Sequence, residues 1–273
     1  MKGFRQHSLR RDGIALTLHV QEGEGPLMLF QHGLCGDAAQ PAAVFPHTSG
    51  VRLAVLECRG HGASEAGEPS AFSIATFADD VAAAIRTISD RPCVVGGISM
   101  GAAIAMRLAV TEPSLVRGLA IARPAWSFSA APANMRPNLA VGERLRKPRT
   151  VGEAEAFAAS ETGRMLAAES PDNLKSLLSF FTREPRSVTA ELLVRISGDG
   201  PGVTRAELAA LRVPTLVIGN SEDHIHPLGL AREITDAIPA ARFLEIPVKT
   251  RGKEAYESAF RAGLGTFLQE ITP

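Results

Sequence analysis

The sequence CVVGGISMGAAIAM occupies residues 93–106 and decides the fold. Its first part, from Cys93 to Gly96, is a short apolar run that predicts a buried strand. The alanine-rich stretch from Ala102 to Val110 predicts a helix. A Gly-x-Ser-x-Gly pattern arises by chance in many glycine-rich chains, so its meaning here comes from the strand before it and the helix after it.

The turn between the strand and the helix, Gly97-Ile98-Ser99-Met100-Gly101, gives one serine an unusual position. A sharp strand-to-helix turn brings the backbone close to its neighbours, and Gly97 and Gly101 leave room where a Cβ would clash. The turn lifts the hydroxyl of Ser99 to the carboxyl end of the sheet, above the N-terminus of the helix. The amide of Met100 then points to where an oxyanion would form. We therefore expect Ser99 to be the reactive serine.

Short apolar runs and amphipathic stretches alternate on either side of this turn. Buried parallel strands have continuous apolar runs, whereas helices repeat their apolar residues every three or four positions. The alternation predicts an α/β fold, with a mostly parallel central sheet and helices on both of its faces. An alternating run at 14–20 predicts an antiparallel edge strand. The expected strands are 27–30, 53–56, 93–96, 119–122, 215–218 and 242–246, and the expected helices are 76–88, 100–110 and 227–238.

The alternation stops near Trp126. Residues 127–207 contain no convincing strand pattern and indicate several short helices separated by prolines. A helical insertion between two strands of a sheet is typical of a lid or cap. We predict a core made of residues 1–126 and 208–273, with a helical cap made of residues 127–207.

The composition narrows the class of protein. Of the 273 residues 45% are hydrophobic, which is enough for one large core with a subdomain. The 29 basic and 29 acidic residues balance, so the charge gives no reason to expect nucleic acid or an anionic membrane as a partner. No apolar run approaches the ~18 residues of a membrane helix, and the charged start does not resemble a secretory signal. We expect a cytoplasmic monomer or homodimer that acts on a small molecule.

The cysteines indicate no structural cross-link. Cys35, Cys58 and Cys93 are odd in number and lack paired spacing, so neither a disulfide framework nor a zinc site is predicted. We expect three reduced, at least half-buried thiols. We also expect no metal and no organic cofactor.

Four blocks of sequence lie outside residues 127–207. They are QHGLCG at 31–36, RGHGAS at 59–64, GISMG at 97–101, and VPTLVIG at 213–219, which is followed by Glu222-Asp223. In this order they resemble the α/β-hydrolase superfamily, in its small type with a cap. The resemblance implies the α/β-hydrolase fold and hydrolytic activity.

The resemblance also implies roles for individual residues. It makes Ser99 the nucleophile and Asp223 the carboxylate that orients a general base. It implies that the backbone amides of Leu34 and Met100 form the oxyanion hole. From its own surroundings, Asp223 is also compatible with a loop carboxylate that caps the helix after it.

The general base is the point at which this sequence departs from the family. Members usually carry a histidine after the last strand, whereas no histidine follows His226 here, and Lys249 stands near that place. A serine hydroxyl needs a base within hydrogen-bond reach. Three solutions are open: His226 or His224 turns inward beside Asp223, Lys249 acts with a pKa lowered by burial, or there is no base. Location favours His226, then His224, although all three are also compatible with structural or surface roles.

Two further residues are expected beside the substrate. Arg123 follows a predicted strand, at the edge where open α/β sheets bind their ligands. It is compatible with holding a substrate carboxylate and with pairing with a nearby acid. Trp126, the only tryptophan of the chain, follows the same strand and is expected at the mouth of the pocket.

These features predict a serine hydrolase that cleaves a small, mostly apolar carboxylic ester, thioester, lactone or amide through an acyl-enzyme. The expected catalytic residues are Ser99, Asp223 and His226. Two alternatives use the same fold: a non-catalytic small-molecule binder, in which Ser99 only donates or accepts a hydrogen bond, and a cofactor-free lyase or perhydrolase. The fold does not separate these functions.

Overall fold

The computed structural model describes residues 2–46 and 50–272 of the chain. The strands form one eight-stranded sheet in the order β1-β2-β4-β3-β5-β6-β7-β8. β2 pairs antiparallel with β1 and β4, and all other pairs are parallel, which confirms the predicted α/β fold. The strands are β1 Phe4–Arg11, β2 Ile14–Gln21, β3 Leu27–Gln31, β4 Arg52–Leu56, β5 Cys93–Ile98, β6 Val116–Ala122, β7 Thr215–Gly219 and β8 Ala241–Glu245.

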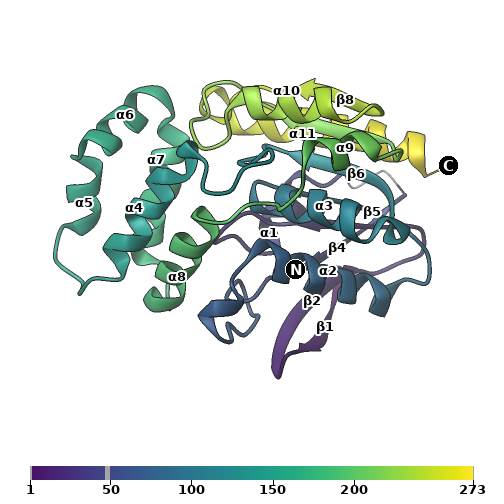
Figure 1. Ribbon diagram of the computed structural model, residues 1–273, viewed down its shortest axis with the longest axis horizontal. Helices are drawn as coiled ribbons and strands as arrows, with labels where there is room; N and C mark the ends of the chain where they lie inside the picture. Colours follow the sequence, from purple (N-terminus) through teal and green to yellow (C-terminus); the bar gives the residue numbers. More distant parts are fainter. Residues whose placement is uncertain (1, 47–49, 273) are drawn as a thin grey trace.

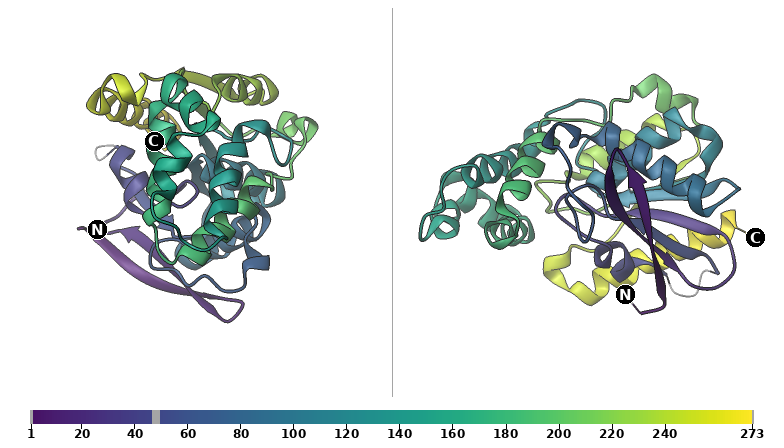
Figure 2. Two further views of the ribbon diagram at one scale, coloured as in Figure 1. Left: turned by 90° about the vertical axis from the view of Figure 1, so that its left-hand side faces the viewer. Right: turned by 90° about the horizontal axis from the view of Figure 1, so that it is seen from below.

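Helices cover both faces of the sheet (Figures 1 and 2). Side chains alternate across β3, with Leu29 in the apolar cluster that contains α2 and α3, and Phe30 in the cluster that contains α11. β4 divides in the same way, with Leu56 in the first cluster and Val55 in the second. Because both faces are buried, these strands have continuous apolar runs. The flanking helices are α1 Ala39–Val44, α2 Ile74–Ile88, α3 Met100–Thr111, α9 Arg205–Ala210, α10 Leu228–Ala237 and α11 Lys253–Ile271.

The first strand, β1, is not among the predicted elements. Its sequence, FRQHSLRR, is polar, and most of its residues are exposed. It nevertheless pairs with β2 along its full length. Asp12 and Gly13 both have positive φ and make the tight turn between the two strands. Asp-Gly is a strong hairpin signal, so the turn rather than an apolar face identifies this strand.

Helices α4 to α8 gather in a lobe beside the sheet, at the left of Figure 1. They share an apolar cluster that includes Val141, Leu166 and Phe181. α8 also packs on the core, because Leu192 and Ile196 belong to the cluster of α2 and α3. The helices are α4 Arg136–Leu145, α5 Glu153–Ala158, α6 Glu161–Glu169, α7 Pro171–Ser179 and α8 Arg186–Ser197. The domain division at 126/127 and 207/208 stays a prediction, and its outer ends, residues 1 and 273, lie outside the described residues.

Candidate active site

Ser99 lies in the turn between β5 and α3, in a strained backbone conformation. Its φ of 59° and ψ of −110° are unusual for a residue with a Cβ. A Cβ on Gly97 would lie 2.3 Å from the backbone of Gly101. A Cβ on Gly101 would lie 2.4 Å from the carbonyl oxygen of Gln31. The turn therefore requires glycine at both positions.

His226 lies between Ser99 and Asp223. Its Nε2 is 2.9 Å from Ser99 Oγ, and its Nδ1 is 2.9 Å from Asp223 Oδ1. The carboxylate fixes the ring with the hydrogen on Nδ1, which leaves Nε2 free to accept the serine proton. This is the geometry of a nucleophile, a base and an orienting acid. Of the three candidate bases, the structure brings His226 to the serine.

Asp223 and His226 are only three residues apart, and the shape of their loop lets the acid contact the base while the base contacts Ser99. Asp223 Oδ1 accepts hydrogen bonds from both the backbone amide and the ring Nδ1 of His226, with the backbone bond at 3.0 Å. Glu222, just before the acid, has a φ of 56°, which turns the chain sharply. The loop between β7 and α10 therefore closes on its own acid and directs the imidazole outward, toward Ser99.

Helix α7 holds this loop from the side of the lobe. Ser170, the residue before α7, donates from its hydroxyl to the Glu222 carbonyl at 3.1 Å and accepts from the His224 amide at 2.9 Å. Asn173 Oδ1 accepts from the Ile225 amide at 3.0 Å. Both of these polar side chains are buried. The lobe thus contributes to the placement of the candidate base as well as to the pocket.

Arg123, at the end of β6, binds the second oxygen of Asp223. Its Nε and Nη2 lie 3.0 and 2.5 Å from Asp223 Oδ2. Nη1 lies 3.4 Å from the Tyr256 hydroxyl, and Nη2 lies 3.2 Å from His226 Nδ1. The sequence left two partners open for Arg123, a substrate carboxylate and a nearby acid, and the structure shows the pairing with the acid Asp223. Tyr256, the only tyrosine of the chain, has no motif that predicts this contact.

Burial and the neighbouring charges together set the ionisation of Asp223 and His226. Burial by itself would raise the pKa of Asp223, but Arg123 and His226 hold it well below its ordinary value. Burial lowers the pKa of His226; Asp223 opposes this and Arg123 adds to it, and the net shift is downward. At neutral pH the carboxylate is therefore ionised and the imidazole is neutral, the states that a base and its orienting acid require.

The two expected oxyanion donors are close to Ser99, Met100 next to it in the chain and Leu34 on the wall of the same pocket. Met100 is the first residue of α3, so its amide has no acceptor within the helix. Leu34 lines the pocket beside Ser99, and within the described ranges its amide has no acceptor. Gln40 Oε1 accepts from the preceding Gly33 amide at 2.6 Å, and His61 Nε2 accepts from the following Cys35 amide at 3.0 Å. The loop is thus fixed on both sides of Leu34.

A pocket of about 370 Å³ opens beside Ser99. Apolar side chains from the lobe form part of its wall, Met135, Leu177 and Phe180 among them. Trp126 does not line it, and its expected place at the pocket mouth is wrong. Its side chain is fully buried in the core, and its Nε1 donates to the Asp199 carbonyl at 2.8 Å. A tryptophan in a core needs such a partner for its N–H, and Asp199 provides it.

The other two candidate bases do not contact the serine in the part of the chain that the structure describes. The ring of His224 lies 3.9 Å from a carboxylate oxygen of Glu169. His224 lines another pocket, which does not contain Ser99. Lys249 begins a short turn after β8, Lys249–Arg251, and lines the pocket of Ser99 without a hydrogen bond to its hydroxyl. Lys249 therefore lies on the wall of the pocket rather than on the nucleophile.

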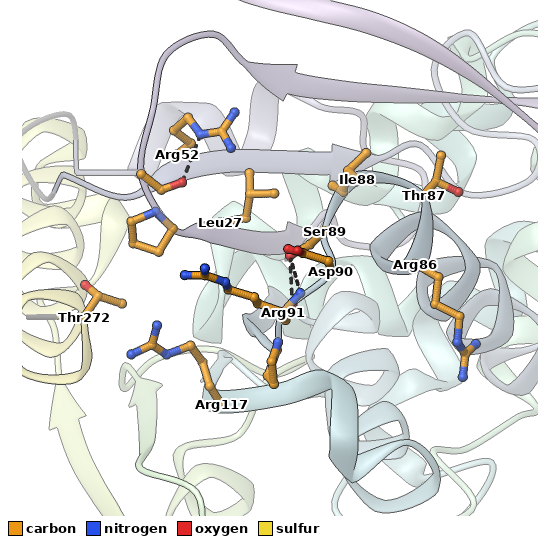
Figure 3. A pocket seen from close by; sticks show the side chains of 13 residues that line it. Leu27, Arg52, Arg86, Thr87, Ile88, Ser89, Asp90, Arg91, Arg117 and Thr272 are labelled. Atoms are coloured by element: carbon orange, nitrogen blue, oxygen red, sulfur yellow. Dashed lines mark hydrogen bonds between the residues drawn. The ribbon is translucent and has the colours of Figure 1, made fainter.

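A second pocket, of about 840 Å³, lies at the opposite edge of the sheet (Figure 3). Leu27 and Arg52, which begin β3 and β4, lie on its wall together with Arg91 and Arg117. It contains none of the predicted site residues. The amino ends of the strands form this pocket, whereas Ser99 lies at their carboxyl ends, so it is separate from the candidate active site.

Residues 2–46 and 50–272 contain neither a candidate metal site nor a candidate membrane-spanning helix. Within these ranges, no three or more His, Cys, Asp and Glu side chains are grouped so that they could hold a metal ion. In the same ranges, no helix is both long enough and apolar enough to cross a bilayer.

A family model described as alpha/beta hydrolase fold matches residues 26–248. The chain belongs to the α/β-hydrolase family. It is similar to the AB hydrolase superfamily protein YisY of Bacillus subtilis, with 29% identity over 260 residues, 88% of this chain and 90% of that protein. It is similar to the 2-(acetamidomethylene)succinate hydrolase of Mesorhizobium japonicum, with 36% identity over 115 residues, 41% of each chain.

Solved structures show the same fold. The enol-lactonase from Burkholderia xenovorans LB400 superposes with a TM-score of 0.73 at 21% identity, over 96% of this chain and 99% of that one. At this identity the likeness concerns the fold. The family match and the relatives named as hydrolases support a hydrolase.

Proposed function

We propose that this α/β-hydrolase is a serine hydrolase, which cleaves a carboxylic ester, thioester, lactone or amide of a small molecule through an acyl-enzyme on Ser99. The observation that carries the proposal is the continuous contact from Ser99 Oγ through His226 to Asp223, with 2.9 Å at each step. A non-catalytic binder has no need for a base held on its serine by an acid. Burial, together with the charge of Arg123, lowers the pKa of His226 and favours the neutral ring that accepts a proton.

In the acylation step, Ser99 Oγ attacks the substrate carbonyl carbon while its proton passes to His226 Nε2. The amides of Leu34 and Met100 stabilise the oxyanion, and Asp223 stabilises the imidazolium that forms. The tetrahedral intermediate expels the alcohol, thiol or amine, which takes the proton back from His226. Ser99 then carries the acyl group.

In the deacylation step, a water molecule takes the place of the leaving group. His226 Nε2 removes one of its protons as the oxygen attacks the acyl carbon. Collapse of the second intermediate releases the carboxylic acid and returns the proton to Ser99. Arg123 takes no proton in either step, and it keeps Asp223 ionised and in place.

Labelling with a fluorophosphonate tests the proposal, because only an activated serine reacts quickly with this reagent. We expect wild-type protein to be labelled at Ser99, and we expect the Ser99→Ala and His226→Ala variants to remain unlabelled. Loss of label in His226→Ala identifies the base, since the nucleophile itself is still present. An unlabelled wild-type protein that binds small carboxylic esters would instead identify the non-catalytic binder.

A further inference from the structure

The pocket beside Ser99 is lined by two lysines that form no ion pair among the described residues. Lys175 on α7 and Lys249 after β8 both line it, on elements that contact each other. Among residues 2–46 and 50–272, the lysine with a carboxylate within 4 Å is Lys253, which pairs with Glu257, and neither Lys175 nor Lys249 has such a partner. Arg123 also lines the pocket, but Asp223 already compensates its charge. Asp172 is the one acidic residue on the pocket wall, so the uncompensated charge of the wall is positive.

A third polar group of the same wall is buried without a partner. Asn138 on α4 is only 6% exposed, and its Oδ1 has no hydrogen-bond partner among the described residues. It lies one turn before Val141 on the buried face of the helix, where an apolar residue would be expected. Buried amides are nearly always paired, because an unpaired one loses its hydration without compensation. Asn138 Oδ1 therefore indicates that a ligand in the pocket supplies a polar atom as its hydrogen-bond partner.

We propose that the substrate is an acyl compound with a carboxylate, which Lys249 and Lys175 bind while Asn138 makes a hydrogen bond to a second polar atom of the same molecule. The proposal rests on the proposed function and deepens it. The sequence left open a substrate carboxylate held by Arg123, and the proposal assigns that carboxylate to the two lysines instead. Ammonium groups attract a carboxylate at a distance and form charge-assisted hydrogen bonds with it at contact.

Two esters with the same leaving group and the same chain length test the proposal. The first is p-nitrophenyl hexanoate, which is neutral, and the second is mono-p-nitrophenyl adipate, whose far end is a carboxylate. We expect wild-type kcat/KM to favour the adipate. Lys249→Met should lower this preference about 10-fold, mainly through the KM of the adipate ester. Lys175→Met should act in the same direction. Lys147→Met, an exposed lysine away from the pocket, is the matched control and should change neither ester.

Asn138→Asp adds a negative charge at nearly constant shape. We expect it to weaken the adipate ester more than the hexanoate ester, which a general folding defect would not do. Equal rates for the two esters in wild type, unchanged by Lys249→Met, would overturn the proposal while leaving serine hydrolysis intact.

Binding separates this proposal from the proposed function. Calorimetry of monomethyl adipate on Ser99→Ala protein needs no turnover. We expect binding that Lys249→Met weakens about 10-fold and that added salt weakens further. Absence of binding, or binding that the lysine variants do not change, refutes the carboxylate site. Failure of fluorophosphonate labelling with intact binding refutes the acyl-enzyme instead.

Discussion

Two loops at the carboxyl edge of the sheet face the same pocket and differ in what they supply. The loop after β7 carries both Asp223 and His226, and it is pinned by Arg123 and by Ser170 and Asn173 of the lobe. The turn after β8, where relatives of this fold usually keep the histidine, carries an exposed Lys249. A general base must reach the nucleophile and must be held in place by its neighbours. Lys249 stands at the usual place in the sequence, but among the described residues it makes neither a hydrogen bond to Ser99 nor supporting contacts of this kind.

The largest expected effect separates the two loops directly. We expect His226→Ala and Ser99→Ala each to lower kcat/KM for p-nitrophenyl hexanoate by at least ~10³-fold, because each removes part of one proton-transfer unit. The double variant should lower kcat/KM little more than either single variant does. A Lys249→Met variant that loses all activity while His226→Ala keeps it would place the base after β8 and reverse the comparison.

Arg123 provides the second test, through the pH profile. Because the pKa of His226 lies below its ordinary value of ~6.5, the wild-type kcat/KM should rise with pH and reach its plateau on the acidic side of that value. Removing the guanidinium removes one cause of the low pKa. Arg123→Gln should therefore move the limb to higher pH and lower the plateau by about 10-fold. Arg117→Gln, at the other edge of the sheet, is the control. A lowered plateau with an unmoved limb would leave Arg123 only a packing role.

Asn173 tests whether the lobe supports the loop after β7. Asn173→Ala leaves the Ile225 amide without its acceptor and loosens the chain next to His226, so we expect kcat to fall by about 10-fold with little change in KM. Asn173→Asp keeps an acceptor oxygen and should restore most of the rate. If both variants behave alike, the hydrogen bond is not what positions the base.

The smallest expected effects concern the two other candidate bases, His224 and Lys249. His224→Ala and Lys249→Met should each keep kcat for the neutral hexanoate ester within about threefold of wild type, because neither side chain contacts Ser99. Parallel pH profiles would show that the limb belongs to neither residue. A shifted limb in Lys249→Met would mean that its charge acts on His226 across the pocket.

The sequence by itself determined seven of the eight strands and the turn at Ser99, because these depend on local patterns. It missed β1, and β2, expected at the edge of the sheet, lies between β1 and β4. Continuous apolar runs mark strands that are buried on both faces, and the glycines at 97 and 101 are dictated by backbone contacts below 2.5 Å. The sequence also favoured His226 over His224 and Lys249 as the base, on location alone, and its catalytic role stays a prediction.

The tertiary structure alone decided the hydrogen-bond partners of the residues around the site. Arg123 and Asp223 are 100 residues apart, and no local pattern tells whether the arginine binds substrate or acid. Trp126 and Asp199 are 73 residues apart, and their contact takes the indole away from the pocket. Ser170 and Asn173 belong to a region whose sequence predicted only short helices. Periodicity reports which face of an element is buried, whereas a hydrogen bond between distant loops depends on how whole elements pack, which no short stretch of sequence encodes.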